Sequence, residues 1–576
     1  MQRFLIFLCF AAFAAAGRAQ TLDPADYVYP VCDVDGSCSA NFGEMRPGHF
    51  HAGVDIRTGG VEGKRLVAVA DGYVSRISVA PGGYGRAIYL TLRNGTTAVY
   101  GHLQRFRDDI EEYLAHERRA QRKNRLNLFF GPEAWPVVQG DPIGFSGNSG
   151  SSMGPHLHFE VRDTPTQRLY NIVHEGIIRP ADTLAPRIVK VHYIEVDSLP
   201  DGLCVHRKAE SYAAVRLGEG NYKLTRSEPI PVGRKGYFVV ETTDRRNGVH
   251  NTFGVWRVTA WIDGEPYFEY RMDGFTFDRS RCCDAVSCYP MQIATRNEAI
   301  RLAQLEAAPD CFYTTMTDRG VIRAGVGEVR RMRIEVEDDS DNVSALEFAV
   351  CGRDEEFRAQ ADSMARIARP GGVTILKCGP ELTARIPAGA LYETVACRPQ
   401  QVAAPAVDSG VVVLSPAFRV LPAATPLRRM MTVSIRAEVP EHLRLHASLA
   451  RITPKGRAAY AGGTFHDGVV SASTYTSDPL FVVADFLPPT IVPRFVSGAD
   501  LSRQSSLGFR VSDNFSGVAS YTLRIDDEWV PCDSYPMKGR LEHVFDTAPT
   551  HTVHNVQLIV RDAAGNAAHW QGTYYR

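Results

Sequence analysis

The sequence predicts a mainly β protein, in which an antiparallel β domain with a helical insertion is followed by β-sandwich domains of the immunoglobulin-like kind. Short β-rich runs alternate with glycine-containing turns from residue 27 to about residue 182. Helical periodicity is concentrated at residues 103–127. A similar proline-containing motif stands at the start of two later segments. At 576 residues the chain is too long for one core, so we expect about three to five domains.

Composition and charge narrow the class of protein. With 44% hydrophobic and 22% charged residues, the chain has the composition of an ordinary globular protein. The formal net charge of -1 argues against a nucleic-acid-binding protein, which needs a basic excess. Binding of an anionic polymer through a local basic patch stays open.

The N-terminus has the features of a cleavable export signal. Arg3 precedes an apolar run over residues 4–16, and small residues suit cleavage after Ala19. The run is shorter than the roughly 20 residues that span a bilayer, and no later stretch is long and apolar enough. We therefore expect a signal peptide over residues 1–19, no transmembrane segment, and an exported protein that is periplasmic, associated with the cell envelope, or secreted.

The cysteines are too sparse for a disulfide scaffold, since there are 12 in the whole chain. Cys32 and Cys38 flank a short loop and form the best candidate pair. Cys282, Cys283 and Cys288 lack the spacing of a zinc site, so they are expected to form bridges or to be buried free thiols.

The first predicted domain covers residues 20–183. Residues 66–70 and 73–77 form a hairpin pattern around an Asp-Gly turn. Residues 87–92 and 96–100 repeat it around an Asn-Gly turn. These hairpins predict an antiparallel sheet.

The helical insertion, at about residues 103–127, has an apolar stripe and a basic second half. The stripe consists of Phe106, Ile110, Tyr113 and Leu114, and the basic residues are Arg118, Arg119, Arg122, Lys123 and Arg125. A solvated helix face is the usual interpretation of such a charge run. A wall of a cleft for an anionic polymer is the alternative.

Three further β-sandwiches are predicted at residues 187–352, 353–486 and 487–576. Residues 184–188 and 487–491 are two versions of one phrase, in which proline opens a strand without needing a ladder donor. Strands that lead into Asp338 and Asp562 are each followed by a tight turn. These aspartates are either calcium ligands or Asx turns, and Asx turns are the more common structure.

Two histidines near residue 157 suggest half of a metal site. On a β-strand His156 and His158 project from one face, whereas Leu157 and Phe159 project from the other. Two imidazoles on one face can both approach the same ion. Alone, this pair is a weak signal.

A second segment supplies complementary ligands. His51 and Asp55 are four residues apart, and Gly53 between them permits a backbone bend that lets both reach one ion. With His158 they form a set of two histidines and one carboxylate, which leaves the fourth zinc position open for water. His49, two residues before His51, is the alternative first ligand.

The order of the motifs carries more information than any one of them. The His51–Asp55 motif precedes a β hairpin, His102 in a Tyr-Gly-His-Leu segment, a glycine-rich stretch at residues 140–150, and the segment with His156 and His158. This succession resembles the lysostaphin-type (LytM-type) zinc metallopeptidases, which cut the peptide part of bacterial peptidoglycan. The resemblance covers about residues 40–163. The layout, a peptidase followed by β-sandwiches, resembles exported peptidases of Bacteroidetes-like Gram-negative bacteria.

The resemblance implies that one Zn²⁺ is bound by His51, Asp55 and His158, and that His102 and His156 are the catalytic histidines that do not bind metal. The implied activity is hydrolysis of peptidoglycan peptide cross-links by a zinc-activated water. His156 is then placed as general base, and His102 stabilises the oxyanion or protonates the leaving amine; the sequence leaves their roles interchangeable.

The sequence leaves three alternatives open, one for the role of Glu160 and two for the function of the protein. Glu160 either orients a ligand imidazole or is an exposed strand carboxylate. The chain could instead be a peptidase-like binding protein that activates other wall hydrolases, although none of the five site residues is missing. It could also be a zinc endopeptidase that acts on proteins.

Overall fold

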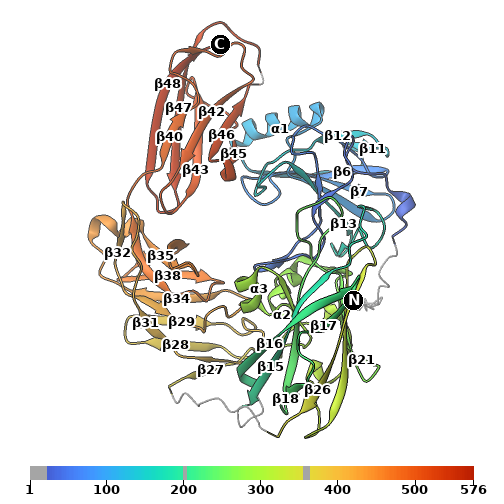
Figure 1. The fold of residues 1–576 in the computed structure, drawn as a ribbon. Helices are drawn as coiled ribbons and strands as arrows, with labels where there is room; N and C mark the ends of the chain where they lie inside the picture. Colours follow the sequence, from blue (N-terminus) through green and yellow to red (C-terminus); the bar gives the residue numbers. More distant parts are fainter. Residues whose placement is uncertain (1–21, 199–203, 355–363, 546) are drawn as a thin grey trace, which may run out of the picture.

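The computed structural model describes residues 22–198, 204–354, 364–545 and 547–576. Its strands form four groups of sheets, arranged in chain order around a ring (Figure 1). The prediction of a mainly β, antiparallel fold is confirmed. The predicted signal peptide at residues 1–19 lies outside the described residues. Among the described residues, no helix combines the length and apolar character needed to cross a membrane.

The first group contains the segments with the predicted site residues. Its main sheet has the order β1-β4-β13-β8-β7-β6-β10, with β11 on β6 and β14 on β13. A smaller sheet has the order β5-β12-β9, and β2 pairs with β3. The elements are η1 (Pro24–Asp26), β1 (Cys38–Ala40), β2 (Met45–Arg46), β3 (His49–Phe50), β4 (Val54–Arg57), β5 (Arg65–Val67), β6 (Gly72–Val79), β7 (Arg86–Leu92), β8 (Thr96–Gly101), β9 (Arg105–Phe106), α1 (Asp108–Gln121), β10 (Leu126–Phe129), β11 (Pro136–Val137), β12 (Pro142–Phe145), β13 (His156–Asp163) and β14 (Leu169–Tyr170).

The helix of the insertion is shorter than the predicted range of about residues 103–127. Residues at both ends of that range form strands instead, because β9 pairs with β12 and β10 pairs with β6. Within α1, Ile110 and Leu114 of the predicted apolar stripe are buried. The helix ends at Arg122, which has a left-handed backbone conformation.

The second group shares its core with the first. Its sheet has the order β23-β19-β15-β16-β17-β26-β25-β20-β21-β24, with β18 on β26, while β22 pairs with β14 of the first group. One cluster of buried side chains runs from Leu22 through both groups to Tyr392. The elements are β15 (Arg187–Ser198), β16 (Cys204–Gly218), β17 (Asn221–Leu224), β18 (Ile230–Val232), β19 (Gly236–Thr243), β20 (Arg257–Ile262), β21 (Glu265–Arg271), β22 (Gly274–Phe275), η2 (Phe277–Cys282), α2 (Cys283–Val286), α3 (Tyr289–Thr295), β23 (Glu298–Arg301), η3 (Asp310–Phe312), β24 (Tyr313–Met316), η4 (Asp318–Gly320), β25 (Val329–Glu337) and β26 (Val343–Gly352).

The third group has two larger sheets, β28-β29-β34-β38-β37 and β31-β33-β39-β35-β36, with β32 on β39 and a separate β27–β30 pair. Residues of both larger sheets share one core cluster. The elements are β27 (Arg366–Ala368), β28 (Thr374–Cys378), β29 (Leu382–Ile386), β30 (Val395–Cys397), β31 (Gln400–Val402), β32 (Val411–Val413), β33 (Ala417–Arg419), β34 (Met431–Arg436), η5 (Glu441–His446), β35 (Ala447–Ile452), β36 (Ala458–Gly462), β37 (Thr464–His466), β38 (Val469–Thr474) and β39 (Leu480–Asp485).

The fourth group consists of two sheets, β40-β42-β46-β45 and β41-β48-β47-β43-β44, around a third core cluster. The elements are β40 (Thr490–Pro493), β41 (Ala499–Asp500), β42 (Ser506–Ser512), β43 (Val518–Ile525), β44 (Glu528–Trp529), β45 (Asp533–Tyr535), η6 (Pro536–Lys538), β46 (Arg540–Val544), β47 (Val553–Asp562) and β48 (Ala567–Tyr575).

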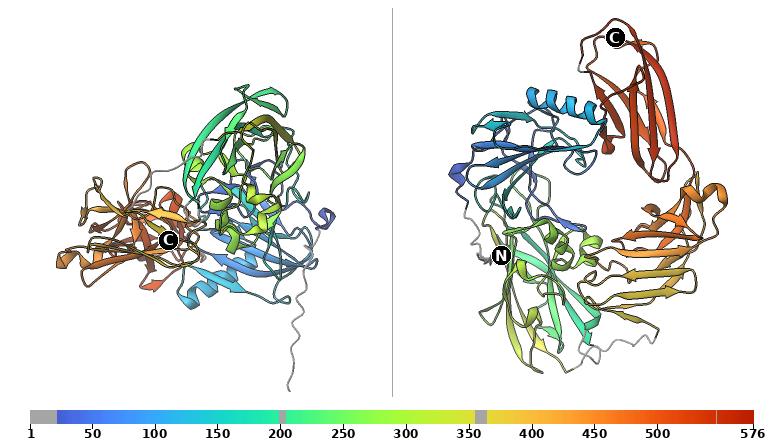
Figure 2. Two further views of the ribbon diagram at one scale, coloured as in Figure 1. Left: turned by 90° about the horizontal axis from the view of Figure 1, so that it is seen from below. Right: turned by 180° about the vertical axis from the view of Figure 1, so that it is seen from behind.

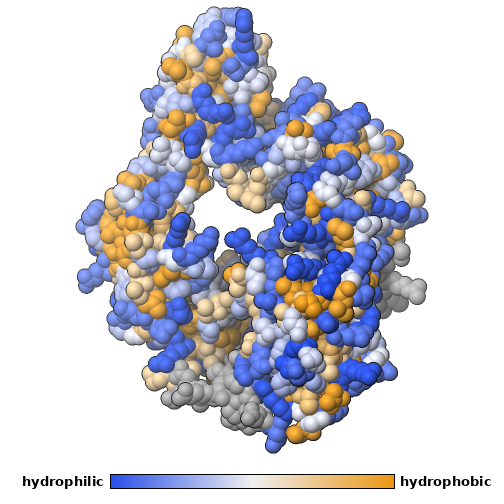
Figure 3. All heavy atoms as spheres, viewed as in Figure 1, coloured by the Kyte–Doolittle hydropathy of each residue, from blue (hydrophilic) through white to orange (hydrophobic). Residues whose placement is uncertain are grey.

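The ring is closed where the fourth group meets the first, beside α1 (Figure 2). Asp533 forms ion pairs with Arg118, at 2.9 Å, and with Arg86, at 3.4 Å. Asn124 accepts a hydrogen bond from the Cys532 backbone at 2.9 Å. An opening remains in the middle of the ring in the space-filling view (Figure 3). The interpretation of the basic run as a solvated face is therefore wrong for Arg118, which is 5% exposed because it makes this contact.

The cysteines differ from the expectation of a Cys32–Cys38 bridge. Both are free thiols, because Cys38 points into the core from β1. Cys282, Cys283 and Cys288 are buried free thiols, which was one of their two predicted states.

Candidate metal centre

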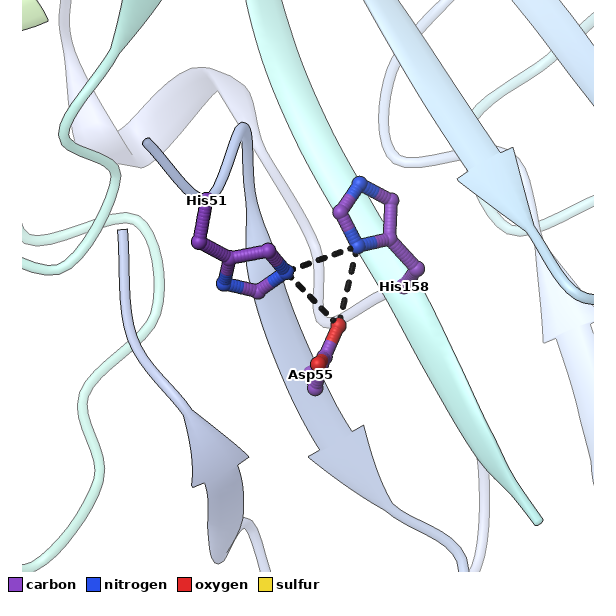
Figure 4. A group of neighbouring side chains, drawn as sticks. All are labelled: His51, Asp55 and His158. Carbon is purple, nitrogen blue, oxygen red and sulfur yellow. Dashed lines mark hydrogen bonds and ion pairs between the residues drawn. The ribbon is translucent and has the colours of Figure 1, made fainter. Parts of the chain in front are cut away.

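Three side chains from two neighbouring strands and one loop converge on one point (Figure 4). In the antiparallel pairing of β4 and β13, Asp55 lies directly opposite His158. His51 follows β3 and reaches the same point from the loop before β4. The closest oxygen of Asp55, Oδ1, lies 2.9 Å from His158 Nδ1 and 3.1 Å from His51 Nε2, and these two nitrogens are 3.2 Å apart.

The unused nitrogen of each of these imidazoles faces a fixed hydrogen-bond acceptor. His51 Nδ1 lies 2.7 Å from the Asn41 carbonyl oxygen. His158 Nε2 lies 2.7 Å from Glu160 Oε1. Because a carbonyl or carboxylate oxygen accepts, these nitrogens carry the protons. When both rings are neutral, the lone pairs therefore lie on His51 Nε2 and His158 Nδ1, the two atoms that face Asp55. Burial lowers the pKa of His158, but hydrogen bonds to Asp55 and Glu160 outweigh it and raise the pKa to about 9, so metal binding displaces a proton from His158 Nδ1.

This donor triangle has the dimensions of a zinc site. Bonds of 2.0–2.1 Å in a tetrahedron place neighbouring ligand atoms about 3.3 Å apart, close to the three separations found here. Two imidazole nitrogens and one carboxylate oxygen are ligands that Zn²⁺ accepts, and three protein ligands leave one position open. The chemistry and spacing of the three residues therefore fit this metal.

Gly53 is required here for a different reason from the predicted backbone bend. Its φ angle is not in the left-handed region, and a Cβ at this position would lie 2.4 Å from the Phe159 carbonyl oxygen. Glycine therefore allows the His51–Asp55 segment to pack directly against β13.

Glu160 is part of a buried network and not an exposed strand carboxylate. It is 1% exposed, and besides His158 it contacts Arg162 and accepts a hydrogen bond from the Tyr84 hydroxyl at 2.5 Å. Burial raises the pKa of Glu160, but Arg162 and the His158 hydrogen bond outweigh it and hold the pKa at about 2. Its carboxylate thus stays ionised and fixes the orientation of the His158 ring.

Arg46 is a neighbour of the site that the sequence motifs did not single out. Its Nη2 lies 3.5 Å from Asp55 Oδ2, the oxygen that faces away from the two imidazoles. Burial raises the pKa of Asp55, but the charge of His51 and hydrogen bonds to the histidines outweigh it and hold the pKa well below its usual value. The guanidinium adds an ion pair at the second oxygen. The only signal in the sequence is its position five residues before His51.

The two remaining predicted histidines lie next to the donor triangle. The rings of His102 and His156 have centroids 4.8 Å apart, and His156 Nε2 lies 3.5 Å from Asp55 Oδ1. His102 Nδ1 donates to the Ser149 carbonyl at 2.8 Å, and His156 Nδ1 donates to the Gly154 carbonyl at 2.8 Å. Each ring therefore keeps an Nε2 lone pair free to take a proton.

His102 is held as a neutral imidazole. Burial, together with the neighbouring His156 and His158, lowers the pKa of His102 to about 3. Its backbone has a φ of 63°, at the end of β8, which turns the ring toward the site. A neutral imidazole is the form that accepts a proton.

His49 takes no part in the cluster. It lies on β3, is exposed, and its Nδ1 contacts the carbonyl of Pro47 at 3.3 Å. Of the two histidines in this segment, the structure brings His51 to Asp55 and His158.

The second group of strands supports the segment that carries His51. The carboxylate of Glu298 accepts hydrogen bonds from the backbone N–H groups of Met45 and Val255, both at 3.0 Å. Asn41, whose carbonyl holds His51, also bonds to the backbone of Gly254 through both atoms of its side-chain amide. Burial raises the pKa of Glu298 to about 7. The first metal-ligand segment is thus fixed by residues more than 200 positions away.

Comparisons with known proteins agree with this geometry. The chain is 32% identical over 113 residues to the DD-carboxypeptidase/endopeptidase Mpg of Neisseria meningitidis, and the match covers 20% of each protein. It is 33% identical over 120 residues to an uncharacterised metalloprotease of Haemophilus influenzae, covering 20% of this chain and 19% of the relative. The chain therefore spans about one fifth of the length of these curated relatives.

Two further matches are a solved structure and a family model that covers the third group of strands. The catalytic domain of the prophage-encoded M23 protein EnpA from Enterococcus faecalis matches with 25% identity and a TM-score of 0.16, over 22% of this chain and 79% of that one. A Zu5-like domain model matches residues 377–485, from within β28 to the end of β39. Over about a fifth of its length this chain is thus similar in sequence to proteins named as peptidases, and the resemblance is to metallopeptidases of the lysostaphin, or M23, type.

Proposed function

We propose that this protein is an exported zinc endopeptidase that hydrolyses the peptide cross-links of bacterial peptidoglycan. The observation that carries the proposal is the complete donor triangle of His51, Asp55 and His158, with two further histidines beside it. A relative named as a DD-carboxypeptidase/endopeptidase supports peptide hydrolysis in the cell wall. The apolar N-terminus, followed by small residues, supports export to the periplasm or cell envelope.

The metal and the protein have separate tasks in this proposal. His51, Asp55 and His158 would hold the Zn²⁺, which when bound would lower the pKa of a water molecule to about 7 and polarise the scissile carbonyl. Arg46 and Glu160 hold Asp55 and His158 in the ionisation and tautomeric states that metal binding requires.

His102 and His156 move the protons. Both rings are fixed by a backbone carbonyl at Nδ1, so Nε2 is the atom that exchanges a proton. One of them takes a proton from the attacking water, and the other hydrogen-bonds to the developing oxyanion or protonates the leaving amine. Because His102 is neutral at physiological pH, its Nε2 can accept a hydrogen bond from the water.

The test is the release of peptide fragments from purified sacculi by the full chain and by Asp55→Ala. We expect the variant to lose activity by at least about 10³-fold, since the metal supplies the nucleophile. His49→Ala is the matched control, because His49 is a nearby histidine outside the cluster. It is expected to keep full activity.

Two results would overturn the proposal. A folded wild-type protein that binds sacculi, contains no zinc and releases no fragment would be a binding or activating protein. Cleavage of a glycine-rich protein such as elastin, with intact sacculi, would make it a protease that acts on proteins. Mass spectrometry of the released fragments identifies the bond that is cut.

A further inference from the structure

A second three-residue cluster lies where the first and second groups of strands join. Asp182 belongs to the segment that leads into β15, Asp244 follows β19, and Asp338 follows β25. One carboxylate oxygen from each residue lies within 4.8 Å of the others. Three chain segments that are far apart in the sequence thus bring carboxylates to one buried point.

Three of the six carboxylate oxygens of this cluster lack the hydrogen bonds that buried carboxylates normally have. Asp244 is 1% exposed, and neither of its oxygens accepts a hydrogen bond. The Asp182 side chain is fully buried, and its Oδ2 also accepts none. An ionised carboxylate buried without partners is strongly unfavourable, so these oxygens are the atoms that a bound cation would stabilise.

The charges around the cluster do not balance. Arg246 pairs with Asp339 at 2.5 Å and lies 3.7 Å from Asp182 Oδ2. One guanidinium is therefore shared by three carboxylates, those of Asp339, Asp182 and Asp244. Burial and the neighbouring Asp338 raise the pKa of Asp244 to about 9, which shows how unfavourable the negative charge is without a further cation.

We propose that Asp182, Asp244 and Asp338 bind a Ca²⁺ ion at this junction. Carboxylate oxygens are hard ligands that suit Ca²⁺, whereas a zinc site uses histidine or cysteine as well. Oxygens on opposite sides of Ca²⁺, at 2.3–2.6 Å from it, are about 4.6–5.2 Å apart, so a cluster of this size can hold the ion. Asp338 is already oriented, because Asn342 and Ser340 donate hydrogen bonds to it.

The ion has a structural task that extends to the metal centre. By binding Asp182 it fixes the segment that connects the two groups of strands. Asp339, next to Asp338, accepts a hydrogen bond from Asn41 at 3.3 Å, and the Asn41 carbonyl holds His51. The calcium site thus stabilises the backbone on which the first ligand of the catalytic metal depends.

A similar cluster elsewhere in the chain shows why this one is singled out. Asp485, Asp513 and Asp562 also lie within 4.8 Å of one another, at the junction of the third and fourth groups. There both oxygens of Asp485 accept backbone hydrogen bonds, from Leu487 and Ser516. Only one oxygen of that cluster, Asp513 Oδ1, is among the buried atoms without a partner in the described part of the chain.

The experiment is calorimetric titration of CaCl₂ into the full chain, already loaded with one equivalent of zinc, together with thermal unfolding. We expect saturable Ca²⁺ binding and a higher Tm in Ca²⁺, because a ligand that binds only the folded state stabilises it. In Asp244→Asn the site should bind at least about 10-fold more weakly and the Tm shift should disappear. Asp341→Asn, an exposed aspartate in the turn after Asp338, is the control and should behave as wild type.

Asp182→Asn provides a second variant if Asp244→Asn does not fold. The absence of Ca²⁺ binding to the wild-type protein would overturn the proposal. Unchanged binding in a folded Asp244→Asn or Asp182→Asn protein would also overturn it, since the ion would then lie elsewhere.

Discussion

The two buried clusters of this protein contrast in how their ligands are prepared. At the centre of His51, Asp55 and His158, hydrogen bonds to Asn41 and Glu160 fix each imidazole in one tautomer. At the cluster of Asp182, Asp244 and Asp338, hydrogen bonds orient only part of the carboxylate set, and Asp244 has none. A preorganised site suits chemistry, whereas a site that is completed by its ion suits a structural role.

The two clusters differ most in the residues that lie beside their ligands: among the described residues, only the histidine-containing cluster has two further histidines there. His102→Ala and His156→Ala should each lower kcat by about 10²–10⁴-fold, the usual contribution of general acid–base catalysis, with unchanged zinc content. Fragment release from sacculi and metal analysis of the same samples measure both quantities. Loss of zinc in either variant would show that the histidine serves as a ligand. The aspartate cluster supplies no ligand atom to the zinc site, so a folded Asp244→Asn protein should keep the zinc stoichiometry of the wild type.

Asp533 is a partly buried carboxylate that is balanced by two guanidinium groups instead of a metal ion. Asp533→Ala leaves Arg86 and Arg118 buried without this partner and should lower the free energy of unfolding by about 3–5 kcal/mol. Urea denaturation measures the loss. Asp500→Ala removes an exposed carboxylate from the same group of strands and is the control. An equal effect of both changes would contradict a role for this contact.

Glu160 tests whether preorganisation matters for metal affinity. Glu160→Gln keeps the size of the side chain but removes the charge that holds the His158 tautomer, and it should weaken zinc binding about 10–100-fold. Competition with a chromogenic chelator measures the affinity. Ca²⁺ binding should be unaffected. Unchanged zinc affinity would show that the His158 orientation does not depend on this carboxylate.

Glu298 tests the support of the His51 segment from the second group. In Glu298→Gln an amide replaces one of the two accepting oxygens, so a backbone N–H of Met45 or Val255 loses its acceptor. We expect a loss of about 1–2 kcal/mol in the free energy of unfolding. Glu265→Gln, an exposed substitution in the same group, is the control for the urea measurement. A neutral result would show that the segment is held by its other contacts.

The two short motifs of the candidate metal centre, His51–Asp55 and His156–His158, could be found in the sequence, and the resemblance in motif order joined them into one predicted site. Strand alternation put His156 and His158 on one face, and antiparallel pairing then placed His158 opposite Asp55. The supporting residues could not be found in this way. Asn41, Glu298 and Asp533 make contacts across hundreds of positions, and each lies in a segment without a recognisable motif.

The cluster of Asp182, Asp244 and Asp338 also shows what a local sequence pattern cannot predict. The turn after Asp338 was visible in the sequence, and the structure confirms an Asx-type turn in which Asp338 accepts bonds from Ser340 and Asn342. That interpretation does not exclude ligand binding, because Asp182 and Asp244 reach Asp338 from other segments. A local pattern identifies the turn, but only the tertiary structure identifies its neighbours.

The closure of the ring changes how deletion experiments on this protein have to be designed. A shortened chain that ends before residue 490 also removes the carboxylate of Asp533, which pairs with Arg118 and, together with Glu111, with Arg86. The Arg86 backbone N–H donates to Ser149 Oγ, and the Ser149 carbonyl holds His102. A C-terminal truncation therefore also changes contacts inside the first group of strands, close to His102. An inactive fragment would not show that the C-terminal strands bind substrate, unless Arg86 and Arg118 are neutralised in the same fragment.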